Sequence, residues 1–72
     1  MDEKEYKNKS RVLMNVFMAT VDTSNVKVAD IIGLTRSAVS YLIKNGTFQL
    51  WRLIYILDYF GYELQIVKKK NE

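Results

Sequence analysis

Residues 25–46, with the sequence NVKVADIIGLTRSAVSYLIKNG, decide how this chain folds. They contain two short amphipathic helical patterns that meet at a Gly-Leu-Thr corner. Ala29 is small enough to let a second helix approach the first, and Gly33 can adopt the positive φ that ends a helix in a left-handed cap. Val39 and Leu42 lie three residues apart on one helical face and would fill the angle between the helices. This spacing predicts a helix-turn-helix unit.

Two further helices are expected to flank this unit. Apolar residues at helical spacing predict one over about residues 10–21, after residues 1–9, a polar segment that is either frayed or a polar first turn. The unit itself contains helices over about residues 26–32 and 35–44. The last helix covers about residues 48–60. The stripes predicted to face inward in the two flanking helices are Leu13, Val16, Phe17 and Val21, and Leu50, Leu53, Ile54 and Leu57.

After Gly61 the apolar residues alternate with their neighbours, which predicts a half-buried strand over residues 62–68. A lone strand leaves its backbone groups unpaired, and the simplest partner is the same strand of a second copy. We therefore expect residues 1–72 to form one mostly α domain of four helices. One short C-terminal β-strand would pair with its copy in a dimer, and residues 69–72 would form a basic and polar tail.

The composition narrows the chemistry that this chain can perform. Its 72 residues include no cysteine and no histidine, so the common general base, the thiol nucleophile and the usual zinc ligands are missing. We expect no enzyme activity, no metal and no cofactor. The net charge is +3, which allows a polyanionic partner without requiring one. Residues 1–10 are polar and no apolar run is long enough to span a bilayer, which predicts a cytoplasmic protein without membrane contact.

Residues 25–66 resemble the lambda-repressor-like (Cro, xenobiotic-response-element) helix-turn-helix family, on the spacing of Ala29, Gly33, Val39 and Leu42. The expected C-terminal strand is similar to the layout of some antitoxin-type members that act as DNA-binding dimers. The resemblance implies that the second helix of the unit enters the major groove of double-stranded DNA. Small regulators of this kind occur in phages, mobile elements and toxin–antitoxin operons.

The residues that would contact DNA follow from this resemblance and from the helical period. Because Val39, Leu42 and Ile43 must face the core, the opposite face of their helix is turned outward. The predicted contacts to bases are Arg36, Ser37, Ser40 and Tyr41. The predicted contacts to phosphate are Ser24, Asn25, Lys27, Thr35, Lys44, Asn45 and Thr47.

Each of these residues also has a simpler interpretation. Arg36 and the lysines can be solvated surface side chains, and Tyr41 can pack sideways on a loop. The basic run at residues 68–70 favours a solubilising tail over a contact with DNA. The last helix has a second apolar stripe that favours packing against another subunit over stacking on bases. The predicted dimer interface consists of Trp51, Tyr55, Tyr59, Tyr62, Leu64 and Ile66.

Two functions from different classes remain open. The first is a transcription regulator that binds DNA sequence-specifically, acting as a homodimeric repressor that occludes a promoter at an inverted-repeat operator. The second is an antitoxin or phage-encoded inhibitor whose main target is a toxin or another protein, because fold alone does not decide function. Substitution of Arg36 separates the two hypotheses. It should weaken binding of the target only if the helix contacts DNA bases.

Overall fold

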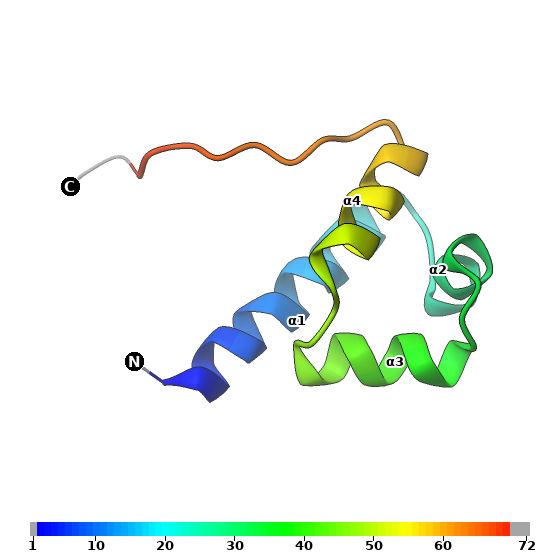
Figure 1. The fold of residues 1–72 in the computed structure, drawn as a ribbon, viewed down its shortest axis with the longest axis horizontal. Helices are drawn as coiled ribbons and strands as arrows, with labels where there is room; N and C mark the ends of the chain where they lie inside the picture. Colours follow the sequence, from blue (N-terminus) through cyan, green and yellow to red (C-terminus); the bar gives the residue numbers. More distant parts are fainter. Residues whose placement is uncertain (1, 70–72) are drawn as a thin grey trace.

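The computed structural model describes residues 2–69, which contain four helices (Figure 1). They are α1 (Glu3–Thr20), α2 (Asn25–Ile32), α3 (Arg36–Asn45) and α4 (Leu50–Tyr59). Helix α3 packs against both α2 and α1, and α4 packs against α2. The predicted mostly helical architecture is confirmed. Residues 70–72 of the predicted tail, including Lys70, lie outside the described residues.

The two helices of the central unit begin and end at residues suited to capping. The Ser24 hydroxyl accepts a hydrogen bond from the Lys27 amide at 3.4 Å, and the Thr35 hydroxyl accepts one from the Ala38 amide at 3.1 Å. Gly33 follows α2 with φ 72°, in the left-handed region where a side chain is unfavourable. Local sequence signals therefore account for the boundaries of α2 and α3.

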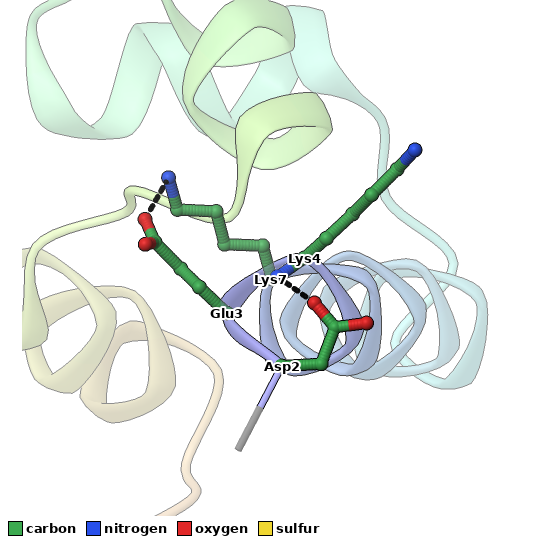
Figure 2. Close-up of polar contacts among 4 residues, drawn as sticks. All are labelled: Asp2, Glu3, Lys4 and Lys7. Atoms are coloured by element: carbon green, nitrogen blue, oxygen red, sulfur yellow. Dashed lines mark hydrogen bonds and ion pairs between the residues drawn. The ribbon is translucent and has the colours of Figure 1, made fainter.

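Helix α1 starts much earlier than the sequence predicts. The Asp2 carboxylate caps it by accepting a hydrogen bond from the Lys4 amide at 3.0 Å, and Glu3 pairs with Lys7 one turn later at 2.8 Å (Figure 2). The turn after α3 also lies directly against this part of α1, because a Cβ placed on Gly46 would come within 2.7 Å of the Lys7 Cα. The prediction that the helix begins near residue 10 is wrong, since a cap and a tertiary contact support the earlier turns.

The core lies where α1 and α4 cover the central unit. Its buried side chains are Met14, Met18, Val28, Ala29, Val39, Ile43 and Ile56. The stripes predicted for the outer helices are partly wrong: Leu13 is 69 % exposed and Leu50 is 63 % exposed, and Val16 and Ile54 are exposed as well. Each outer helix carries more than one apolar row, and the row that is buried depends on the neighbouring helices. In α4, Leu57 is buried as predicted, whereas Ile56 is buried in place of Leu50 and Ile54.

The chain after α4 is an extended arm over residues 62–69 and forms no strand there. The predicted strand over residues 62–68 is therefore not observed, because nothing else in residues 2–69 is extended alongside it to complete a ladder. The Tyr62 amide still donates a hydrogen bond to the Leu57 carbonyl at 2.8 Å. The Tyr62 ring is perpendicular to that of Phe17, with the ring centres 5.6 Å apart. Beyond this anchor the arm is exposed, and it leads away from α4 (Figure 1).

Candidate nucleic-acid interface

The angle between α2 and α3 is closed by small and branched side chains. Val28 and Val39 are completely buried and Ala29 nearly so. The Leu34 amide donates a hydrogen bond to the Ala29 carbonyl at 3.0 Å, which holds the turn against the end of α2. Because α3 buries Val39 and Ile43, its opposite face is directed away from the core.

The outward face of α3 is uncovered by the rest of the described chain. Arg36 and Ser37 are exposed at its first turn, Tyr41 is 65 % exposed at its middle, and Lys44 is exposed in its last turn. Within residues 2–69 the only ion pair joins Lys7 and Glu3, so neither Arg36 nor Lys44 is engaged by a carboxylate there. This face therefore offers two cationic groups, a hydroxyl and an aromatic ring to a partner.

Two of the residues predicted to contact DNA, Asn25 and Ser40, are hydrogen-bonded to each other. The Asn25 side-chain amide donates a hydrogen bond to the Ser40 hydroxyl at 2.8 Å, in a partly buried position between α2 and α3. Ser40 is half-buried, unlike its neighbours on the outward face. This contact joins α2 to the middle of α3.

The remaining predicted phosphate contacts lie at three places. Ser24 and Lys27 at the start of α2 line a shallow hollow of about 410 Å³ that Arg36 also borders. The Asn45 side chain donates a hydrogen bond to the Tyr41 carbonyl at 2.8 Å, and the Thr47 amide donates one to the Leu42 carbonyl at 3.0 Å. The hydroxyl of Thr35 accepts a bond as the cap of α3 but can still donate its own hydrogen.

The structure contains a basic pocket that was not predicted from the sequence. It lies where α1 passes the end of α3, has a volume of about 310 Å³, and is lined by Lys4, Lys7, Asn8, Arg11, Lys44 and Asn45. The four lining residues from α1 are spaced i, i+3, i+4 and i+7. Predicting a helix over the N-terminal residues would therefore have placed them on one face. The net charge of +3 does not by itself reveal this arrangement.

The residues predicted for a dimer interface are exposed in the single chain. Trp51 is 60 % exposed on α4, with the Arg52 guanidinium 4.9 Å from its ring centre. Tyr55 and Tyr59 are also exposed on α4, as are Tyr62, Leu64 and Ile66 on the arm. Within residues 2–69 this aromatic and aliphatic surface is thus largely uncovered, although the Tyr62 ring contacts Phe17.

Among residues 2–69 there is no group of three or more acidic, histidine or cysteine side chains that could hold a metal ion. Likewise, no helix within that range is long and apolar enough to cross a membrane. The pKa of Glu3 lies below its ordinary value because the carboxylate accepts a hydrogen bond from the Lys7 ammonium and is attracted by its charge.

Comparison with known proteins adds no relative from which a function could be transferred. No protein-family model matches this sequence, and no curated protein or solved structure matches it significantly.

Proposed function

We propose that this protein is a transcription regulator of the lambda-repressor-like helix-turn-helix type that binds double-stranded DNA sequence-specifically. The observation that carries the proposal is the outward face of α3. Arg36, Tyr41 and Lys44 are exposed on a helix whose opposite side is held in the core by Val39 and Ile43. A rigid helix with a polar, cationic outer face suits the major groove, which is wide enough to admit a helix.

The proposed contacts divide between bases and backbone. Arg36 is placed to make a bidentate contact with guanine, which is the commonest base-specific contact of arginine. Ser37 can donate or accept beside it, and the Tyr41 ring can contact a thymine methyl group. Lys44 and Lys27 supply charge to phosphates on either side of the groove. In this assignment Asn25 and Ser40 orient α3, because their polar atoms are bonded to each other.

The proposed active form is a homodimer that represses by occluding a promoter. Its support is the exposed apolar surface of α4 and the arm, which includes Trp51, Tyr55 and Ile66. Two copies related by a two-fold axis would bind an inverted-repeat operator with half-sites about 34 Å apart, one turn of DNA. Such a repressor would act by occupying the site, within a bacterial cytoplasm or a phage-infected host.

The test is a mobility-shift titration with the DNA immediately upstream of the protein's own gene. Arg36→Ala should weaken operator binding by about 1–3 kcal/mol. Arg36→Lys is the matched control, since it preserves the charge but loses the planar fork. It should retain affinity for mixed-sequence DNA while losing preference for the operator. Binding that is unaffected by both changes would contradict a role of α3 in reading bases.

A second candidate is an antitoxin or phage-encoded inhibitor whose main target is a protein. The observation that favours it is the pair of exposed aromatic rings, Trp51 and Tyr55, on one helix, because such residues are enriched in protein interfaces. The two functions respond to different substitutions. Trp51→Ala should abolish capture of a protein target and Arg36→Ala should leave it intact.

A further inference from the structure

We infer that the basic pocket between α1 and the end of α3 binds the phosphate backbone of DNA, as a second anchoring site beside the groove-reading face. This inference rests on the proposed function and extends it to α1, which the sequence reasoning assigned no role. The pocket is lined by side chains from residues far apart in the chain, namely Lys4, Lys7, Asn8 and Arg11 from α1 and Lys44 and Asn45 from α3.

The pocket is positively charged despite the acidic residues near it. The Glu3 carboxylate engages Lys7 at 2.8 Å and offsets its charge. Asp2 caps the backbone of α1, and the Lys4 side chain extends away from the Asp2 and Glu3 carboxylates (Figure 2). Lys4, Arg11 and Lys44 therefore remain as cations that no carboxylate within residues 2–69 pairs with.

Hydrogen-bond donors are also available in the pocket. Arg11 donates through Nε and Nη2 to the Asn8 side-chain oxygen, at 3.2 and 2.6 Å, which orients the guanidinium beside α1. The Asn8 amide hydrogens are not used by that contact. Planar guanidinium and amide donors next to lysine ammonium groups match the several acceptor oxygens of a phosphodiester.

The pocket is rigidly placed relative to α3. Gly46, at φ 66°, brings the chain so close to α1 that a Cβ there would lie 2.7 Å from both the Cα and the carbonyl oxygen of Lys7. The separation between the pocket and the groove-reading residues is therefore set by backbone packing and not by flexible side chains.

The position of the pocket fits a DNA strand at the far side of the groove. Lys44 belongs both to the outward face of α3 and to the lining of the pocket, so the two surfaces are continuous. Along α3, Lys44 lies roughly 12 Å from Arg36, at a rise of 1.5 Å per residue. The major groove is of similar width, about 12 Å. With Arg36 at the bases, the pocket would reach a backbone phosphate.

The experiment measures how DNA affinity depends on salt. Each phosphate contact removed should reduce the slope of log affinity against log salt concentration by about 0.9. The variant Lys4→Gln/Arg11→Gln should therefore lose roughly 1.8 in slope on a mixed-sequence duplex. The ratio of wild-type affinity to variant affinity should therefore fall about ten-fold when the salt concentration rises from about 50 to about 200 mM.

The control makes the same charge change outside the pocket. Lys9 is on the same helix but lies over the Tyr6 ring at 4.7 Å and borders a different, apolar groove, and Lys69 is on the arm. Lys9→Gln/Lys69→Gln should leave the slope near that of wild type. An equal fall in both double variants would show that only the total charge matters, and would overturn the inference.

The outcome separates this inference from the proposed function. Wild-type binding with an unchanged slope in Lys4→Gln/Arg11→Gln would overturn the pocket and leave the regulator intact. No binding of wild type to any duplex would overturn both. If the double variant unfolds, amide chemical shifts of the wild-type protein titrated with the duplex decide the matter. Shifts in residues 4–11 together with those of α3 support the pocket, and shifts confined to α3 overturn it.

Discussion

The side-chain amide of Asn25 donates a hydrogen bond to the hydroxyl of Ser40 at 2.8 Å, which joins the first turn of α2 to the middle of α3. Fifteen residues separate the two in sequence. The bond is partly buried, so its groups would be poorly solvated if it were broken. It links the orientation of α3, the proposed groove-reading helix, to a residue outside that helix.

Asn25→Ala should destabilise the protein by about 1 kcal/mol, because the half-buried Ser40 hydroxyl loses its partner. It should also weaken operator binding although Asn25 need not touch DNA. Urea unfolding of Asn25→Ala, Ser40→Ala and the double variant measures the coupling. The cost of the double variant should be smaller than the sum of the single costs. Strict additivity would show that the bond contributes nothing.

Gly46→Ala should destabilise the protein more than Gly33→Ala. Both glycines follow a helix in the left-handed region, with φ of 66° and 72°, so alanine at either incurs a backbone cost of about 1–2 kcal/mol. Only at Gly46 would the new Cβ also meet the backbone of Lys7, whereas nothing lies within 4 Å at Gly33. Thermal unfolding compares the two, and equal losses would contradict the close packing of α1 on the turn after α3.

The Glu3 carboxyl should titrate below its ordinary pKa of 4.5, because the Lys7 ammonium donates a hydrogen bond to it and attracts its negative charge. A lowered pKa in the folded state means that the associated stability is present above the unfolded-state pKa and is lost as pH falls through the folded-state pKa. NMR titration of the carboxyl carbon measures this directly. In Lys7→Gln the pKa should return towards 4.5, and an unchanged value would exclude the ion pair as its cause.

Ile66→Ser should leave the stability of a single chain unchanged and weaken self-association. Ile66 is fully exposed, at 104 % of the reference area, so its side chain packs against nothing within residues 2–69. If the arm contributes to a dimer, the serine variant buries less apolar surface when two chains associate. The dimer should therefore be weaker. Sedimentation equilibrium at micromolar concentration measures the change. Leu13→Ser, at another exposed apolar position outside the predicted interface, is the matched control.

Much of the central unit is determined by sequence alone, because its signals are local. Ser24 and Thr35 cap the helices, Gly33 permits the left-handed turn, and Val39 has the helical spacing that buries it. None of these requires knowledge of a distant neighbour. The outward position of Arg36 follows from the same periodicity.

Only the tertiary structure decides the rest, because it depends on which elements meet. Helix α1 has several apolar rows, and packing against α3 selects Met14 and Met18 over Leu13. The basic pocket exists because Lys4 and Lys44, forty positions apart, are brought together by that same packing. The alternating arm has strand character in sequence but no ladder within residues 2–69, since a strand is stabilised by pairing with another backbone and not by its own pattern.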